Sequence, residues 1–319
     1  MRFGILGDAK IARNCLRPAI LSAGHQITTI GRRDPSKGAD PIWGDVAVKT
    51  YDGLLADDTV DAVYIALPNH LHVPYAIKAL EAGKPVICEK PVALNLEELA
   101  RLEEAAQRSG CDLYDGYMVR YHPQWDWLQG CDVGSRQAIH AHFSYPPHKA
   151  DNIRSKPEWG GGPIWDIGCY CLLSGLMLFD GTPELLSFTK HKLPNQPVEH
   201  LASAIVSFSH DASDEAQILT FTCSGGIGLA QSLQLVGTHG WAKLEVPFNP
   251  PQEATAYFAR ADDGRKDLLG AGEMVTFAAC DQYELMVKDF VQAVEDGRKT
   301  DLSYSRHITK ILSTMVEGD

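Results

Sequence analysis

The first third of the chain alternates short apolar runs with amphipathic stretches. Four runs have the length and composition of buried strands: residues 2–6, 25–30, 60–67 and 85–89. Three stretches between or after them carry apolar residues at helical spacing: residues 8–21, 73–82 and 95–109. Strand and helix repeat with short connections, which predicts an α/β fold with a parallel, doubly wound Rossmann sheet.

Local signals sharpen two of these helices. Asn95-Leu-Glu-Glu98 has the form of a capping box, and Gly110 supplies a stop, so the third helix is expected between them. Pro18 lies inside the first helix and is expected near a kink or in the last turn, because proline has no amide hydrogen to donate.

The pattern changes after about residue 121. Residues 137–145 alternate between the two faces of a strand, and Gly237-Thr-His-Gly240 predicts a hairpin turn. Further strands are expected at residues 203–209, 216–224, 229–236 and 241–246, and helices at 282–295 and 303–315. The sequence therefore predicts two domains, a dinucleotide-binding domain at 1–121 and a second domain at 122–319 with a largely antiparallel sheet.

Composition narrows the range of partners. The 319 residues carry a net charge of -12, which argues against nucleic acid or an anionic membrane as the main partner. No run of eighteen apolar residues occurs, and the N-terminus begins directly with a strand, without the pattern of a signal peptide. The eight cysteines are scattered and are expected to be reduced core residues of a cytoplasmic protein.

The first strand ends in a glycine loop. Gly7-x-Ala9-x-x-Ala12 fits the dinucleotide fingerprint with alanine in place of its second glycine. Gly7 would form the tight turn, Ala9 would allow close approach of a pyrophosphate, and Ala12 would pack helix on strand. Backbone amides at the helix start would bind the phosphates. The loop residues expected to hold the cofactor are Gly7, Asp8, Ala9, Lys10 and Ile11.

The end of the second strand bears on cofactor choice. Sites that prefer NAD place an acidic residue there, but this chain has Arg32 and Arg33 after Gly31. Guanidinium groups suit a 2′-phosphate, so the sequence favours NADP, with NAD still possible. The alternative is that Asp34 caps a helix beginning at Pro35 and that both arginines are solvated.

Other candidates follow the third and fourth strands. In open α/β sheets, ligands bind outside the carboxyl ends of the strands. Glu89-Lys90-Pro91 lies at such an end, and a lysine there can meet cofactor and substrate together. The segment after the third strand is expected to line the nicotinamide pocket with Leu67, Pro68, Asn69 and His72.

Three motifs together resemble the Gfo/Idh/MocA oxidoreductases. These are Pro68-Asn-His-Leu-His72, Glu89-Lys90-Pro91 and Gly160-Gly-Gly-Pro-Ile-Trp-Asp166-Ile-Gly-Cys-Tyr170. The chain looks most like the branch of dimeric dihydrodiol dehydrogenases and NADP-dependent D-xylose dehydrogenases. The resemblance implies a second α/β domain with an open, largely antiparallel sheet that supports homodimers or homotetramers. It also implies that Lys90 and Tyr170 are the catalytic pair.

A lysine and a tyrosine suit the oxidation of an alcohol. Tyrosine is a weak base at its ordinary pKa of about 10, and a nearby ammonium favours phenolate. We expect Tyr170 to exchange the hydroxyl proton and Lys90 to orient substrate, cofactor and phenol. Asp166, four residues before Tyr170, would share the same helix face and the same substrate. The alternative for Tyr170 is an aromatic anchor in a domain interface.

Weaker candidates complete the predicted site. Arg120 is expected either to border the substrate cleft or to form an interdomain salt bridge, and Trp165 either to stack on a sugar or to lie in the core. The paired histidines lack an acidic or thiolate partner at ligand spacing, so no metal site is expected.

The leading hypothesis is an NADP-dependent dehydrogenase acting on a sugar or polyol, with oxidation of an aldose at C1 favoured. Alternatives are a reductase of a sugar-derived ketone or dicarbonyl compound, a non-catalytic NADP-sensing regulator, and NAD-dependent glycoside hydrolysis. Intact Lys90, Asp166 and Tyr170 argue against a sensor, which needs none of them.

Overall fold

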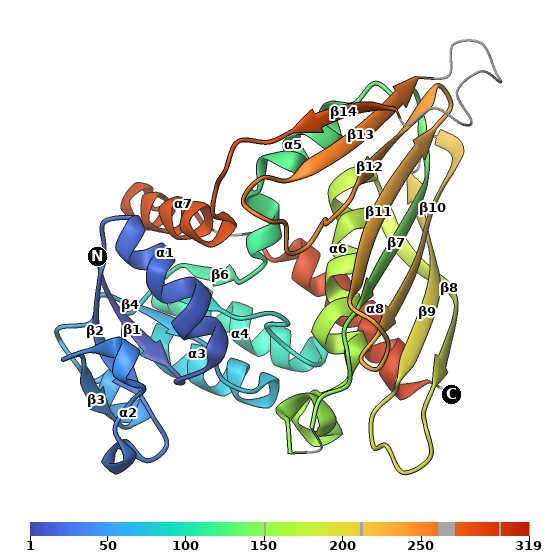
Figure 1. The fold of residues 1–319 in the computed structure, drawn as a ribbon. Helices are drawn as coiled ribbons and strands as arrows, with labels where there is room; N and C mark the ends of the chain where they lie inside the picture. Colours follow the sequence, from blue (N-terminus) through green and yellow to red (C-terminus); the bar gives the residue numbers. More distant parts are fainter. Residues whose placement is uncertain (150, 211–212, 261–271, 300, 319) are drawn as a thin grey trace. The chain divides into compact units, whose positions relative to one another are not determined.

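The computed structural model of the chain describes residues 1–149, 151–210, 213–260, 272–299 and 301–318. The chain forms two compact units (Figure 1). The first contains Met1–Tyr121 and Asp281–Thr309, and the second contains His122–Cys280 and Lys310–Asp319. The expected change at residue 121 thus coincides with the end of a unit.

The C-terminal helices correct the expected extent of the second domain. The helix α7 (Gln282–Asp296) was expected there but packs in the first unit. Its Phe290 ring contacts Phe3 at 6.1 Å and Tyr114 at 5.2 Å between ring centroids. The division between units falls within the last helix, α8 (Ser303–Glu317). The aromatic contacts of Phe290 place α7 in the first unit. The position of α7 in the sequence, after the second domain, does not reveal these contacts.

The sheet of the first unit is parallel throughout its described residues. Its strands are β1 (Arg2–Leu6), β2 (Gln26–Gly31), β3 (Ala47–Lys49), β4 (Ala62–Ile65), β5 (Val86–Cys88) and β6 (Leu113–Asp115). They follow the order β3-β2-β1-β4-β5-β6. The order reverses between β1 and β4, which is where ligands bind in doubly wound sheets.

Helices cover both faces of this sheet. The helices α2 (Tyr51–Leu55), α3 (His72–Glu81) and α4 (Leu96–Ser109) share one apolar core with Leu6 and Ile65. On the other face, α7 packs against Phe3 and against the helix α1 (Arg17–Ser22). The predicted capping of α4 is confirmed, since the Asn95 side chain accepts from the Glu98 amide at 2.8 Å and Gly110 adopts φ +70°.

Pro18 does not break the first helix. A π-helical segment, Ala12–Leu16, runs directly into α1, and Pro18 lies in the first turn of α1. The wider π turn is a common way to absorb a residue that does not fit the α-helical ladder. The position of the irregularity was therefore predicted, but its form was not.

The second unit is built on one mixed sheet. Its described strands are β7 (Arg136–Ser144), β8 (Thr182–His191), β9 (Leu201–His210), β10 (Ser213–Ser224), β11 (Ala230–Gly237), β12 (Gly240–Leu244), β13 (Thr255–Arg260) and β14 (Glu273–Thr276). They follow the order β14-β13-β12-β11-β7-β10-β9-β8. Every described pair is antiparallel except β7 with β10. Gly237 pairs with Gly240, which confirms the predicted hairpin.

One face of this sheet carries helices. The helix α6 (Cys169–Leu178) packs on β7 and β10, and α5 (Pro123–Gly130) lies on the same side, whereas the opposite side of the central strands is open (Figure 1). The buried side chains of β10, such as Leu219 and Phe221, alternate with side chains on the open face. The sheet therefore has one apolar, covered face and one accessible face.

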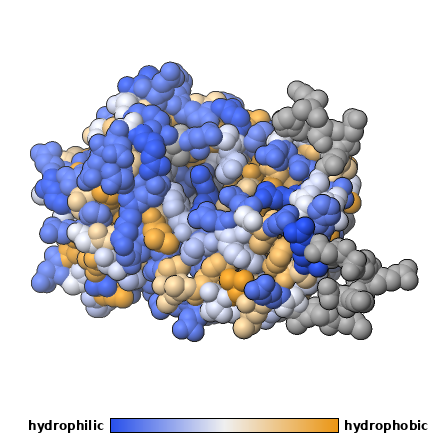
Figure 2. All heavy atoms as spheres, turned by 90° about the horizontal axis from the view of Figure 1, so that it is seen from above, coloured by the Kyte–Doolittle hydropathy of each residue, from blue (hydrophilic) through white to orange (hydrophobic). Residues whose placement is uncertain are grey.

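The helices and the surface were compared with what a membrane protein requires. None of the described helices is long and apolar enough to cross a lipid bilayer. On the face shown in Figure 2, hydrophobic residues form small separate areas among hydrophilic ones.

Among the cysteines expected in the core, Cys88, Cys171 and Cys223 are fully buried, and burial raises the pKa of each thiol well above its usual value.

Candidate active site

Gly7 stands where β1 passes into the first helix. Its φ is +102°, and its amide donates to the Gly31 carbonyl at 3.0 Å. A Cβ atom at this position would lie 2.5 Å from the Ala66 carbonyl oxygen. Because the site requires both left-handed backbone and a missing side chain, only glycine fits. The tight turn of the dinucleotide loop is therefore built as the fingerprint predicts.

Asp8 is the centre of a hydrogen-bond network in the same loop. Its carboxylate accepts from Arg13 Nη1 at 2.8 Å, Arg32 Nη1 at 3.1 Å and Trp43 Nε1 at 2.8 Å, and from the Asp40 amide at 3.0 Å. Burial alone would raise the pKa of Asp8, but the hydrogen bonds from Trp43, Arg13 and Asp40 outweigh it and lower the pKa. Asp8 is thus an ionised anchor for two arginines.

The two arginines after β2 differ in their surroundings. Arg32 is half-buried and donates both to Asp8 and to the Gly38 carbonyl, which fixes its guanidinium beside the glycine loop. Arg33 is exposed. Asp34 caps the short helix at Pro35–Lys37 through the Ser36 amide, so the capping predicted as an alternative is present as well. Capping by Asp34 and the placement of Arg32 are compatible.

The ends of β4 and β5 lie beside the loop on one edge of the sheet. The Ala66 amide donates to the Leu6 carbonyl at 2.9 Å, and the Glu89 amide donates to the Ile65 carbonyl at 3.0 Å. Parallel strands place their carboxyl ends on one edge, so the segments after β1, β4 and β5 are neighbours. The residues concerned are Leu67, Pro68, Asn69, Glu89 and Lys90. Glu89 also accepts a hydrogen bond from the Tyr64 phenol.

His72 lies beneath this edge. It is 1% exposed, and its Nδ1 and Nε2 lie 2.8 Å from the Pro91 and Leu67 carbonyl oxygens respectively. Burial lowers the pKa of His72 to about 4, against the two carbonyl oxygens, which favour the charged ring. The imidazole therefore joins the segment after β4 to the turn that carries Lys90.

Arg120 forms its ion pair within the first unit. Its Nη1 lies 3.1 Å from Asp115 Oδ1, and its guanidinium carbon lies 5.3 Å from the Tyr304 ring centroid. Asp115 is buried and also accepts from the Ser305 hydroxyl at 2.8 Å. Burial raises the pKa of Asp115 in spite of the arginine. These contacts attach Arg120 to the start of α8.

Tyr170 lies in the first turn of α6, in the second unit. Its ring is 5% exposed and packs between two phenylalanines, with centroid distances of 5.9 Å to Phe143 and 5.8 Å to Phe248. The rings hold the phenol in one orientation. Trp165, expected to contact either a sugar or the core, is 4% exposed and belongs to the buried set.

Asp166 forms an ion pair with Arg154, a residue for which the sequence predicted no role. Arg154 Nε lies 2.5 Å from Asp166 Oδ2, and the Tyr145 phenol interacts with the same carboxylate. Asp166 lies in a π-helical segment, Ile164–Gly168, that leads into α6. The carboxylate, first among several causes, raises the pKa of Arg154, and Tyr170 contributes in the same direction. Arg154, Asp166 and Tyr170 therefore form one electrostatic cluster.

The glycine run explains how this cluster is built. A Cβ on Gly161 would lie 2.7 Å from the Arg154 and Lys156 carbonyl oxygens. The Gly162 amide donates to the Arg154 carbonyl at 2.9 Å. These contacts pin the segment carrying Arg154 against the start of the helical segment. Glu199, 6% exposed, accepts from the Ile164 amide at 3.0 Å and caps that start.

No metal centre accompanies these residues. Within the described part of the chain, no three His, Cys, Asp or Glu side chains are grouped so that they could hold a metal ion.

Comparison with protein families agrees with this arrangement. The family described as "Oxidoreductase family, NAD-binding Rossmann fold" matches residues 1–117, and the Gfo/Idh/MocA C-terminal domain matches residues 126–243. The chain belongs to the Gfo/Idh/MocA oxidoreductase family. The resemblance inferred from the three sequence motifs is thereby confirmed, as is the predicted fold class.

Several known proteins match this chain over almost their whole length. An uncharacterised oxidoreductase of Rhizobium meliloti is 34% identical, with 99% of this chain and 96% of the relative covered. D-xylose 1-dehydrogenase (NADP(+)) 2 of Haloferax volcanii is 31% identical, with coverage of 100% and 98%. The solved structure of KijD10, a 3-ketoreductase from Actinomadura kijaniata in complex with NADP and TDP-benzene, superposes with a TM-score of 0.84 at 25% identity, with coverage of 99% and 96%.

Proposed function

We propose that this protein is an NADP-dependent oxidoreductase that interconverts a carbinol and a carbonyl group on a sugar or polyol, with oxidation of an aldose at C1 as the favoured reaction. Family membership supports hydride transfer, and the similarity to an NADP-dependent xylose dehydrogenase supports the aldose substrate. The observation that carries the proposal is the edge of the first sheet, where the Gly7 loop, Arg32 and the Lys90 turn follow the carboxyl ends of β1, β2 and β5.

The residues at this edge fit a dinucleotide. Gly7 forms the tight turn that the fingerprint requires, closed against the Ala66 carbonyl, and Ala9 would allow close approach of a pyrophosphate. Arg32, oriented by Asp8, would bind the 2′-phosphate of NADP, and Lys10 and Ile11 begin the helix whose amides face the phosphates. When bound, NADP accepts or supplies the hydride at its nicotinamide ring.

The proton is the task of the protein. In the oxidative direction the Tyr170 phenolate would take the proton of the substrate hydroxyl as hydride leaves the same carbon. Lys90 would orient the substrate and favour the phenolate. His72, enclosed by two backbone carbonyls, would act by positioning the Lys90 turn rather than by touching the cofactor. Asp166 would bind a substrate hydroxyl beside Tyr170.

Reduction is the second candidate direction. Its support is the likeness to KijD10, which is named a 3-ketoreductase. The same phenol would then donate its proton to a carbonyl oxygen while hydride reaches the carbon. Because hydride transfer is reversible, the residues serve both directions equally and substrate supply decides between them.

A coenzyme assay tests the function. NADP⁺ and NAD⁺ reduction would be followed across aldoses, polyols and dihydrodiols, and NADPH oxidation across keto sugars. We expect turnover with NADP⁺ and at least one aldose, and loss of turnover in Lys90→Ala and Tyr170→Phe with NADP⁺ binding retained in the latter.

Matched controls come from α3. Lys78 and Tyr75 lie together there, with the ammonium 5.1 Å from the ring centroid, outside the candidate site. Lys78→Ala and Tyr75→Phe should therefore turn over like the wild type. Tight NADP⁺ binding with no turnover of any alcohol or ketone would contradict the enzymatic function and favour a cofactor-sensing regulator instead.

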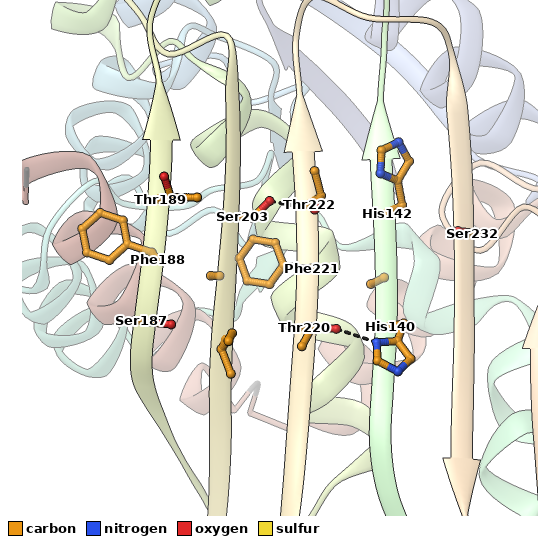
Figure 3. A pocket seen from close by; sticks show the side chains of 13 residues that line it. His140, His142, Ser187, Phe188, Thr189, Ser203, Thr220, Phe221, Thr222 and Ser232 are labelled. Atoms are coloured by element: carbon orange, nitrogen blue, oxygen red, sulfur yellow. Dashed lines mark hydrogen bonds between the residues drawn. The ribbon is translucent and has the colours of Figure 1, made fainter.

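We also propose that the open face of the second sheet joins copies of this chain into a homodimer or homotetramer. A hollow of about 450 Å³ lies on that face. The residues that line it include histidines, hydroxylated residues and the apolar Phe188 and Ile205, without a carboxylate or ammonium. Figure 3 shows His140, His142, Thr220, Thr222 and Ser203 among them. Charge depletion is typical of interface cores.

Light scattering tests the assembly. The wild type should have at least twice the mass of one chain, and Thr222→Arg should reduce it, because a buried guanidinium in the centre of the interface has no partner there. A Lys78→Ala control should leave the mass unchanged. A monomeric wild type at micromolar concentration would contradict this proposal without touching the catalytic one.

A further inference from the structure

Arg154 is the residue around which the cluster in the second unit is organised. Its side chain is 39% exposed and that of Asp166 is 15% exposed, so the pair is accessible on the arginine side and sheltered on the carboxylate side. Gly161 and Gly162 hold the Arg154 backbone against the helical segment that carries Asp166. A structure that fixes both partners in this way spends little entropy in keeping them together.

The carboxylate of Asp166 opposes ionisation of the nearby Tyr170 phenol. Asp166 precedes Tyr170 by four residues on one helical stretch, and a negative charge beside a phenol disfavours phenolate. Arg154 carries the compensating positive charge and lies within electrostatic range of both Asp166 and Tyr170. Without it, the base proposed above would face an uncompensated negative charge.

We propose that Arg154 is a positioning residue of the active site: it orients and neutralises Asp166, so that Tyr170 exchanges its proton beside an ion pair rather than beside a bare carboxylate. This inference rests on the proposed function. It assigns a role to the Asp151-Asn-Ile-Arg154 segment, which neither the dinucleotide loop nor the lysine–tyrosine pair explains.

Few other titratable groups face this part of the helix in the described residues. The Tyr145 phenol, after β7, interacts with Asp166, and burial, with Asp166 in second place, raises the pKa of Tyr145, so it stays neutral. Cys223 on β10 is buried, and its thiol is likewise neutral. Glu199 caps Ile164 at the far end of the π-helical segment. Arg154 and Asp166 are therefore an ion pair that the described residues of this unit place within electrostatic range of Tyr170.

Two substitutions of opposite sign test the role. Arg154→Gln removes the cation and should raise the pH midpoint of the acid limb of kcat for alcohol oxidation by about one unit or more, with activity recovering at high pH. Asp166→Asn leaves the cation unopposed and should lower the midpoint. Arg154→Lys keeps the charge and should move the midpoint less than Arg154→Gln.

A double variant separates the direct from the indirect effect. If Arg154 acts through Asp166, the upward shift of Arg154→Gln should be largely abolished in Arg154→Gln/Asp166→Asn. A kcat that falls equally at every pH, with an unmoved midpoint in Arg154→Gln, would mean that Arg154 is structural only and would overturn the proposal. A shift that persists in the double variant would overturn the route through Asp166.

A second readout does not need turnover. The phenolate absorbance of each protein would be titrated against its Tyr170→Phe counterpart, so that the difference reports Tyr170 alone. The midpoint should move in the same directions as the kinetic one. If the wild type turns over no substrate, the function fails while this titration still decides the role of Arg154. If Arg154→Gln does not fold, Asp166→Asn and Arg154→Lys carry the test, and an unmoved midpoint in Asp166→Asn refutes it.

Discussion

Replacing Gly162 by alanine should destabilise the second unit. Gly162 has φ +103°, and a Cβ atom there would lie 2.4 Å from Glu199 Oε1 and 2.8 Å from its Cδ. The Glu199 side chain is enclosed and cannot simply swing away without releasing the Ile164 amide that it caps. The substitution therefore strains the backbone and removes a helix cap together.

The magnitude follows from these two costs. A left-handed backbone costs a residue with a Cβ about 1–2 kcal/mol. Leaving the buried Ile164 amide without its acceptor costs about 1–3 kcal/mol. The free energy of unfolding of the second unit should therefore fall by about 2–5 kcal/mol, a large part of the stability of an ordinary domain.

Urea unfolding followed by tryptophan fluorescence measures this change. Five of the six tryptophans lie between residues 122 and 280, so the signal reports mainly the second unit. Gly130→Ala is the matched control, because Gly130 lies in α5 with nothing within 4 Å of the position of its Cβ. It should change stability by less than about 1 kcal/mol. Equal stability of Gly162→Ala and the wild type would refute the reasoning.

Three further variants test the roles of the charged residues Asp57, Glu199 and Arg32. Lys49 and Thr29 hold the pKa of Asp57 well below its usual range, against burial, so this carboxylate stabilises the first unit above about pH 4 and its contribution is lost as the pH falls further. Asp57→Asn should thus lower the urea midpoint most at pH 7 and by a smaller amount at pH 3, where the folded carboxylate is still ionised. Burial raises the pKa of Glu199, so its ionisation costs stability as the pH rises, and the stability of Glu199→Gln relative to the wild type should improve between pH 5 and pH 8. Arg32→Ala should weaken NADP⁺ binding about 10- to 100-fold in calorimetry and leave NAD⁺ binding nearly unchanged; equal losses would contradict a contact with the 2′-phosphate.

Strongly periodic segments of the fold could be predicted from the sequence. The strands β1, β2, β4 and β5 and the helices α3 and α4 appear where apolar runs and capping signals placed them. The strands β3 and β6 were missed because each has three residues, too few to show a period, and neither is apolar throughout, as the equally short β5 is. The strand β8 was missed because it lies at the sheet edge with most of its side chains exposed, so its polar and apolar positions hardly contrast.

The site shows a similar division. The loop glycine, Lys90, Asp166 and Tyr170 could be proposed as site residues because each belongs to a contiguous motif. Their partners could not, because nothing local connects Asp8 with Trp43 or Glu199 with Ile164, which are 35 residues apart in each case. Such pairs are set by tertiary packing, and one sequence contains no trace of the pairing.

Two glycines, Gly7 and Gly162, are the residues whose positions in the sequence come closest to indicating these tertiary contacts. Gly7 and Gly162 both have positive φ, and each leaves room for an oxygen atom that a Cβ would displace, the Ala66 carbonyl in one unit and the Glu199 carboxyl in the other. Each also stands just before a helical segment that carries site residues. A glycine in that position means that something rigid approaches the backbone there. In both places an acceptor oxygen lies close to the position that a Cβ atom would occupy. This contact holds the helix after the dinucleotide loop and the helix that carries Asp166 and Tyr170.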